Sequence, residues 1–171
     1  MSELTRTLEE KTLLERAERV LPGGSLGNVR LNDEYAFIVR EGDGSHIRDV
    51  SGNRYIDYAS GLGPYILGYG HPVVNDAIKK QLKDGHVFGL CHPLEIELSE
   101  LLCEIIPCAE MVRIGRNGSD VTSIAVRLSR AHTGRDIVLC GGYHGFQDWY
   151  IGSTERNAGI PQVVRDLTKP F

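Results

Sequence analysis

The sequence lacks several features that would place it in a special class of protein. No apolar run approaches the length needed to cross a membrane, and residues 1–10 are polar and charged, without the apolar core of a secretory signal. Lys and Arg number 19 against 23 Asp and Glu, a formal net charge of -4, so no basic field favours nucleic acid or an anionic membrane. These absences predict a cytoplasmic protein that binds neither nucleic acid nor membranes.

Cysteine is scarce and shows no ordered spacing. The four cysteines form no Cys-x-x-Cys pair, which indicates reduced thiols packed in a core rather than disulfides. His86, Cys91 and His92 lie close together in the sequence. Their spacing fits no standard zinc pattern, and no fourth ligand is evident. We therefore expect no metal site.

Glycine, by contrast, is abundant. The 20 glycines gather in clusters, and such clusters mark turns and, in some proteins, backbone that wraps a ligand. With 41% hydrophobic and 25% charged residues over 171 positions, the chain has the length and composition of an ordinary globular domain with a hydrophobic core.

The first part of the chain predicts one helix followed by short strands. Residues 7–21 place apolar side chains on one helical face, and the Pro-Gly-Gly sequence at 22–24 ends that helix. Residues 35–58 contain short apolar runs with a turn at 51–53, which predicts antiparallel strands. Residues 59–71 are glycine-rich and irregular.

From Pro72 onward the pattern changes to helices that alternate with strands. The expected helices are Pro72 to Gly85, Pro93 to Ile106 and Ser119 to His132, and the expected strands are Met111–Ile114 and Asp136–Cys140. Strand, glycine turn, helix and strand make a βαβ unit of a parallel sheet. We therefore divide the chain into an N-terminal helix with a small β-lobe, 1–65, and the start of a larger α/β domain, 66–171. The tail after Trp149 shows little periodicity, so we expect it to be irregular.

Two glycine-containing turns beside predicted strands carry the candidate chemistry. Residues 116–120 (RNGSD) stand between a strand and a helix start, where free N–H groups and the helix dipole favour an anion. The alternative is a simple N-cap, a position that Asn, Ser and Asp favour in any helix. Residues 141–145 (GGYHG) follow a strand, where ligands of open α/β sheets gather. An aromatic ring there can stack on a planar cofactor; the alternative is a surface turn.

These turns, together with residues 43–72 (DGSHIRDVSGNRYIDYASGLGPYILGYGHP), carry a family resemblance. Residues 111–145 are similar to the cofactor-phosphate loop, its helix and the following Tyr-His-Gly turn of class III pyridoxal-phosphate (PLP) aminotransferases. The GPYILGYGHP form resembles the glutamate-1-semialdehyde 2,1-aminomutase branch. The resemblance implies an α/β fold, that of a fold-type I PLP-dependent transferase, with the N-terminal segment and the first part of the large parallel-sheet domain present.

The same resemblance implies a set of cofactor-binding residues. They are Asn117, Gly118, Ser119, Asp120, Tyr143 and His144. The first four form the phosphate loop, the tyrosine would stack on the pyridine ring, and the histidine would lie close by. Asn117 and Ser119 replace the serine and threonine that are usual in this loop.

The substrate side of the site is less complete. Arg30 aligns with an arginine that, in the aminomutase branch, helps to hold a substrate carboxylate, a task for which the guanidinium fork is well shaped. The alternative is a solvated surface arginine. Leu62 stands where the aminomutase has a tryptophan beside the substrate, which leaves transaminase and aminomutase activities both open.

The family's chemistry also needs a lysine that forms a Schiff base with PLP and an aspartate on the pyridine nitrogen. The lysines are Lys11, Lys79, Lys80, Lys83 and Lys169. None matches the family's lysine position, so no catalytic residue is assigned and the chain alone is expected to be inactive.

Two functions follow from this resemblance. The first is a PLP-dependent class III aminotransferase or aminomutase, which moves an amino group between small-molecule donor and acceptor through a Schiff-base intermediate and is a homodimer when complete. The second is a non-catalytic truncated chain or partner subunit with only part of the cofactor site.

Overall fold

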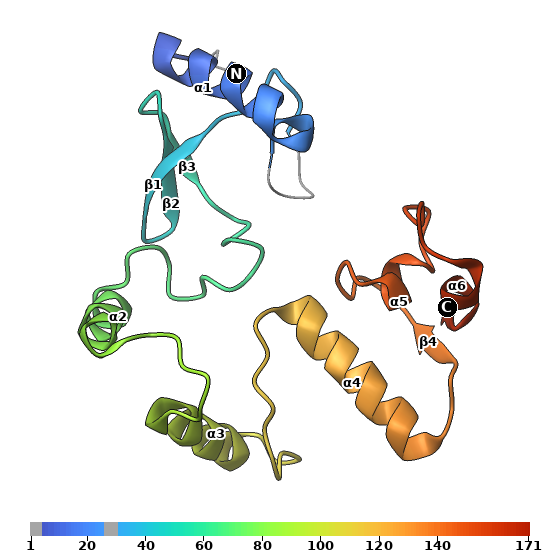
Figure 1. Cartoon of the computed structure of the whole chain (residues 1–171). Helices are drawn as coiled ribbons and strands as arrows, with labels where there is room; N and C mark the ends of the chain where they lie inside the picture. The colour runs from blue at the N-terminus through green and yellow to red at the C-terminus, as the bar shows by residue number, and fades with distance from the viewer. Residues whose placement is uncertain (1–4, 26–30) are drawn as a thin grey trace. The chain divides into compact units, whose positions relative to one another are not determined.

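The computed structural model describes residues 5–25 and 31–171, and it divides into two compact units, Met1–Gly89 and Leu90–Phe171. The first unit opens with helix α1, Leu8–Val20 (Figure 1). Thr7 caps α1, because its hydroxyl accepts the backbone N–H of Glu10 at 3.4 Å. A short 3₁₀ helix, η1 (Pro22–Gly24), follows. The predicted helix at 7–21 is therefore confirmed to within one residue at each end.

Three short strands form the antiparallel sheet of the first unit. They are β1 (Val39–Asp43), β2 (His46–Asp49) and β3 (Arg54–Ile56), in the order β1-β2-β3. His46 lies opposite both Asp43 of β1 and Ile56 of β3. The antiparallel strands expected within residues 35–58 are therefore present, and the predicted turn at 51–53 joins β2 to β3.

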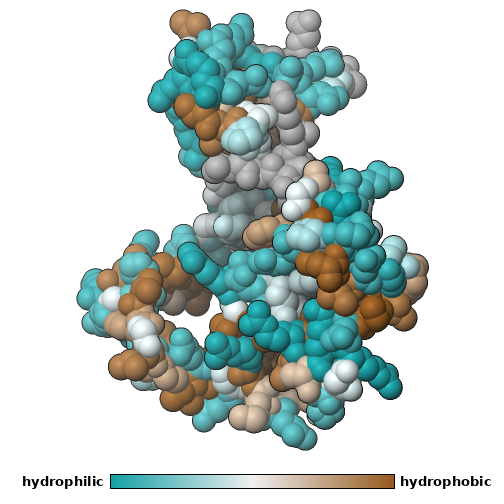
Figure 2. Space-filling view, turned by 45° about the vertical axis from the view of Figure 1, so that its right-hand side comes forward, coloured by the Kyte–Doolittle hydropathy of each residue, from teal (hydrophilic) through white to brown (hydrophobic). Residues whose placement is uncertain are grey.

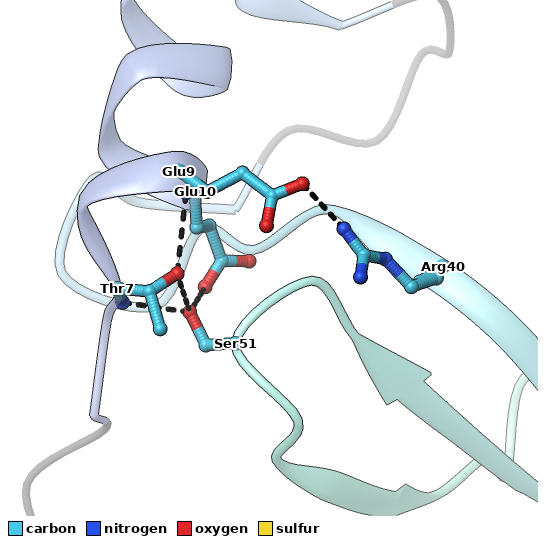
Figure 3. A network of polar contacts seen from close by, with 5 residues as sticks. All are labelled: Thr7, Glu9, Glu10, Arg40 and Ser51. Carbon is cyan, nitrogen blue, oxygen red and sulfur yellow. Dashed lines mark hydrogen bonds and ion pairs between the residues drawn. The ribbon is translucent and has the colours of Figure 1, made fainter.

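A buried carboxylate joins α1 to this sheet (Figure 3). Glu10 is fully buried and accepts the backbone N–H of Ile38 at 2.8 Å. The hydroxyl of Ser51, in the β2–β3 turn, donates to its other carboxylate oxygen. The backbone N–H of Thr7 donates in turn to the Ser51 hydroxyl, at 2.8 Å. The beginning of α1 is thus fixed to the sheet by hydrogen bonds that satisfy a buried charged group.

A second buried carboxylate closes the β2–β3 turn. Asp49 is 1% exposed and accepts the Asn53 side chain at 2.8 Å and the Tyr55 hydroxyl at 2.7 Å. Burial alone would raise the pKa of Asp49, but these hydrogen bonds, with those from backbone N–H groups, outweigh burial and lower it. Burial and the bond to Asp49 raise the pKa of Tyr55 well above its usual value.

Helix α2, Pro72–Asp84, completes the first unit, and α3, Pro93–Ile105, begins the second. Proline occupies the first turn of both helices, as expected for a residue whose missing N–H costs nothing there. At the start of α3, Nδ1 of His92 accepts the Leu94 N–H and the carboxylate of Glu95 accepts the His92 N–H. Both predicted helices are confirmed.

The second unit also contains α4 and a pair of parallel strands. Helix α4, Gly118–Thr133, ends at Gly134, whose left-handed backbone (φ 66°) suits a residue without a side chain. Strand β4, Val138–Cys140, pairs in parallel with β5, Thr168–Pro170. Between them lie α5, Asp148–Ile151, and α6, Gln162–Asp166.

Two sequence predictions for this unit are wrong. The tail after Trp149 is not irregular, because it forms α6 and the strand β5. Residues 111–114 form no strand, and Met111 is 91% exposed. A strand needs a neighbouring strand to satisfy its backbone groups, and in the described part of the second unit β4 takes β5 as its partner instead. A parallel pair was expected between a strand at 111–114 and β4. The observed partner of β4 is β5, which follows β4 in the sequence.

The core is small. Among the described residues, the buried apolar side chains are Cys140, Tyr150 and Ile160, all in the second unit. The apolar faces of α2 and α3 are largely exposed, with Ile78 at 53% and Leu101 at 50%. Figure 2 shows such apolar side chains, in brown, at the surface. The domain boundary predicted between residues 65 and 66 differs from the boundary between the two compact units, at residues 89 and 90. The two domains stay a prediction.

None of the helices in the described ranges is both long and apolar enough to cross a membrane.

Candidate functional site

The start of α4 is where the sequence predicts an anion site. Asn117 is the N-cap residue: its side-chain oxygen accepts the Asp120 N–H at 3.0 Å, and its amide nitrogen donates to the Asp120 carboxylate at 2.9 Å. The capping alternative is therefore correct for Asn117. It is compatible with the predicted anion site, because the first-turn N–H groups of Gly118 and Ser119 have no acceptor within the helix.

Gly118 and Ser119 offer different features to a ligand. A side chain built on Gly118 would meet no atom within 4 Å, so a ligand can approach the backbone closely there. Ser119 is 8% exposed, and its hydroxyl accepts the Phe146 N–H at 3.2 Å. A hydroxyl that accepts one bond still has its own proton to donate. The helix start therefore combines open backbone N–H groups with an oriented hydroxyl, as a phosphate requires.

The loop after β4 carries the predicted stacking residue. Tyr143 is 71% exposed, and its ring meets Tyr150 edge to face, with centroids 5.7 Å apart. The Tyr150 hydroxyl donates to the Gly142 carbonyl at 2.8 Å. His144 is half-buried, with Nε2 2.7 Å from the Gly141 carbonyl and its ring edge-on to Tyr150. Tyr143 is thus mostly exposed to solvent, while His144 supports the loop.

Gly145 brings this loop against α4. It is buried and has φ of 107°, a backbone conformation that side chains disfavour. A Cβ atom at this position would lie 2.3 Å from the Ser119 hydroxyl oxygen. Glycine is therefore required at this position for the loop to reach the helix.

Sequence reasoning missed three side chains that join the two segments. The Thr122 hydroxyl lies 2.9 Å from the His144 carbonyl and 3.1 Å from the Ser119 carbonyl. Ser123 donates to the Ser119 carbonyl at 2.8 Å, and the Trp149 indole N–H donates to Ser123 at 3.0 Å. The one available signal was spacing, because residues three and four positions after Ser119 share its helical face.

The structure therefore brings the two predicted turns together through Ser119 and the 144–146 segment. Arg30, the predicted substrate residue, lies outside the described residues. Over residues 5–25 and 31–171, no three His, Cys, Asp or Glu side chains gather as metal ligands would.

Comparison with known proteins identifies the family of this chain. Residues 29–171 match the family model Aminotransferase class-III, and the chain belongs to that family. It is 43% identical over 175 residues to a glutamate-1-semialdehyde 2,1-aminomutase of Methanothermobacter thermautotrophicus, covering 96% of this chain and 42% of the relative.

Solved structures agree. A transaminase with PLP bound superimposes with a TM-score of 0.88 at 30% identity, covering 98% of this chain and 42% of that one. An omega-transaminase from Sphaerobacter thermophilus gives 0.85 at 30% identity, covering 95% and 41%. The predicted fold class, the fold-type I transferase fold, is confirmed. The chain spans about two fifths of the length of these relatives.

Proposed function

We propose that this chain supplies the phosphate-binding and ring-stacking part of a PLP site in a class III aminotransferase or aminomutase. The observation that carries the proposal is the joining of an open helix start, at Gly118 and Ser119, to a loop that exposes an aromatic ring, Tyr143. PLP supplies the electron-accepting ring that allows an amino group to leave one small molecule and join another.

The residues present fit this group. First-turn N–H groups and the helix dipole attract a phosphate dianion, and the Ser119 hydroxyl can donate to it while it accepts from Phe146. Asn117 and Asp120 hold the loop's conformation through their mutual hydrogen bonds. The Tyr143 ring stacks on the planar pyridine, and His144 keeps that loop in place.

The amino donor and acceptor are small molecules, and Arg30 would bind a carboxylate of one of them. The relative from Methanothermobacter is an aminomutase and the Sphaerobacter protein is an omega-transaminase, so amino transfer between two molecules and transfer within one molecule are both consistent with these residues. The complete protein is proposed to be a cytoplasmic homodimer. The exposed apolar faces of α2 and α3 favour association, and light scattering of the full-length protein tests it: a monomer would contradict this.

The alternative is a chain with a partial site and no activity of its own. It is favoured by the lysines, none of which matches the family's lysine position. We expect the 171-residue chain to bind PLP weakly and without a covalent link. Absorbance of the PLP-chain mixture, before and after borohydride reduction and dialysis, measures this directly. A stoichiometric adduct trapped on one lysine, such as Lys169 of the second unit, would contradict noncovalent binding.

Two substitutions test the cofactor site itself. Ser119→Ala removes one hydrogen bond to a charged phosphate, which contributes about 1.5–3 kcal/mol, and Tyr143→Ala removes the stacking surface. Both should weaken PLP binding by about tenfold or more in a fluorescence titration. Ser129→Ala, at an exposed position of α4, is the matched control. Equal PLP affinities for all three variants and the unaltered chain would refute the proposed site.

A further inference from the structure

The loop that carries Tyr143 is held at two carbonyl groups, one on each side of that residue. The Tyr150 hydroxyl donates to the Gly142 carbonyl at 2.8 Å, and the Thr122 hydroxyl contacts the His144 carbonyl at 2.9 Å. The Tyr143 side chain itself is mostly exposed. The position of its ring therefore depends on its backbone, which these two hydroxyls hold, and on its edge-to-face contact with Tyr150.

Thr122 differs from Tyr150 in the element from which it reaches the loop. It lies on α4, three residues after Ser119, whereas Tyr150 belongs to α5, which follows the loop directly. A threonine hydroxyl has one proton, and two carbonyl oxygens compete for it here. The shorter contact, 2.9 Å, is to His144 across the segments, and the longer, 3.1 Å, is to Ser119 within the helix. Thr122 therefore joins the loop to the first turn of α4, which also forms the proposed anion site.

We propose that Thr122 is a positioning residue that sets the distance between the phosphate subsite at Gly118–Ser119 and the stacking ring of Tyr143. This inference rests on the proposed PLP function. The phosphate and the pyridine ring of PLP are held at a fixed separation by covalent bonds, so both subsites are satisfied together only when the protein holds the same spacing. Thr122 would influence ring stacking without contacting the cofactor.

The loop has a further contact with α4 that does not involve Thr122. Gly145 already lies against Ser119, whose hydroxyl accepts the Phe146 N–H. That contact fixes the far end of the loop, beyond His144. Thr122 holds the His144 carbonyl, which lies nearer to Tyr143 along the chain than the Phe146 N–H does. Loss of Thr122 should therefore leave the loop attached to α4 while it releases the ring.

The test uses the full-length protein and three changes. Thr122→Val keeps the shape of the side chain and removes the hydroxyl, Thr122→Ser keeps the hydroxyl, and Thr133→Val is the matched control. Thr133 is on the same helix, and its hydroxyl donates to the Ser129 carbonyl at 2.8 Å and accepts the Arg135 N–H at 3.3 Å, both at the other end of α4 from Ser119. Thermal unfolding without cofactor confirms that each variant is folded.

Three measurements separate positioning from a general structural effect. PLP affinity should fall about three- to tenfold in Thr122→Val, and the induced circular dichroism of bound PLP should change. The affinity for inorganic phosphate, measured by competition with PLP, should change less than twofold. In a Tyr143→Ala background the Thr122→Val change should add no further loss of PLP affinity, because the ring that it positions is gone.

Each outcome decides the question. Unaltered PLP affinity in Thr122→Val, a loss in Thr122→Ser equal to that in Thr122→Val, or additive losses with Tyr143→Ala would each overturn the inference and leave the proposed function standing. If Thr122→Val does not fold, Thr122→Ser still tests the inference, because a loss of PLP affinity in a variant that keeps the hydroxyl would overturn it. Failure of the unaltered protein to bind PLP overturns the proposed function and this inference with it.

Discussion

The two units of the chain bury different kinds of polar group. The first buries carboxylates, Glu10 and Asp49, which tie a helix to a sheet and close a turn. The second buries hydroxyls: Ser119 joins α4 to the loop after β4, and Thr168 joins β5 to α5. A carboxylate makes strong bonds that depend on pH, whereas a hydroxyl makes weaker bonds that do not titrate.

This difference suits the work that the second unit is proposed to do. A buried carboxylate beside a phosphate would repel it, but a neutral hydroxyl can accept one bond and donate another to an anion. The Asp120 carboxylate, in the first turn of α4, is bound by the Asn117 amide. In the first unit no anion is proposed at the helix–sheet contact, where the buried carboxylate of Glu10 accepts hydrogen bonds from both sides.

The sharpest test of the second unit is Gly145→Ala. The new methyl group would overlap the Ser119 hydroxyl in a backbone conformation that alanine disfavours. Strain and overlap each cost about 1–3 kcal/mol, so we expect a loss of about 4 kcal/mol in the free energy of unfolding, measured with urea. Gly142→Ala is the matched control, because Gly142 also has positive φ but no neighbouring atom within 4 Å. It should cost about 1–2 kcal/mol; equal losses would contradict the close approach at Ser119.

The corresponding test of the first unit is Glu10→Leu. It leaves the Ile38 N–H and the Ser51 hydroxyl without their buried acceptor. Loss of hydrogen bonds to a charged group predicts a decrease of about 3 kcal/mol in the free energy of unfolding. Glu9→Gln changes the neighbouring residue, whose ion pair with Arg40 is exposed (Figure 3), and should cost less than about 0.5 kcal/mol. Similar losses for both would show that the buried network contributes little.

Asp49→Asn tests the pH dependence that separates the two units. The pKa of Asp49 is lowered in the folded protein from its ordinary value of 3.8. Its contribution to stability is therefore complete above about pH 3.8 and is lost as the pH falls through the lower folded-state pKa. We expect the variant to be about 2 kcal/mol less stable than the unaltered protein at pH 7.

At acid pH the difference should shrink, because the unaltered protein loses the same charge. Urea unfolding of both proteins at pH 7 and pH 3 measures this. Asp76→Asn is the control, since Asp76 forms an exposed ion pair with Lys79 on α2 and should show a small difference at both pH values. A constant difference for Asp49→Asn would mean that its carboxylate is not specifically stabilised.

The helices could be predicted from the sequence more fully than the contacts between segments. Helices α1 to α4 follow local signals, namely amphipathic spacing, proline in the first turn and glycine at the end, and these act within a few residues. Strand β5 was missed because three residues at 168–170 have no periodicity of their own, and they become a strand only by pairing with β4. Residues 111–114 show the reverse case. They have a local apolar pattern but form no strand, because they pair with no neighbouring strand in the described sheet.

The candidate site divides in the same way. Ser119 and Tyr143 stand in motifs that the sequence displays, and the family resemblance of those motifs implies a phosphate contact and a stacking ring. Thr122 contacts a residue 22 positions away in the sequence, and Glu10 contacts residues 28 and 41 positions away. No local pattern specifies such contacts. The capping role of Asn117 was one of two open interpretations, since the same residue types serve a cap and a phosphate site.

The smallest expected effect on stability belongs to Gly118→Ala, and it separates ligand binding from folding at one position. Gly118 is the first residue of α4, is exposed and does not have positive φ. A methyl group there meets no protein atom within 4 Å, and alanine favours a helix more than glycine does. The free energy of unfolding without cofactor should therefore stay within about 0.5 kcal/mol of its original value or rise slightly.

PLP affinity should nevertheless fall in Gly118→Ala, because the methyl group occupies space through which a phosphate reaches the first-turn N–H groups. Urea unfolding and a PLP titration of the same preparation measure the two quantities, with Ser129→Ala as the control for a gain in helix propensity. A variant that keeps its original PLP affinity would place the phosphate elsewhere than at the start of α4.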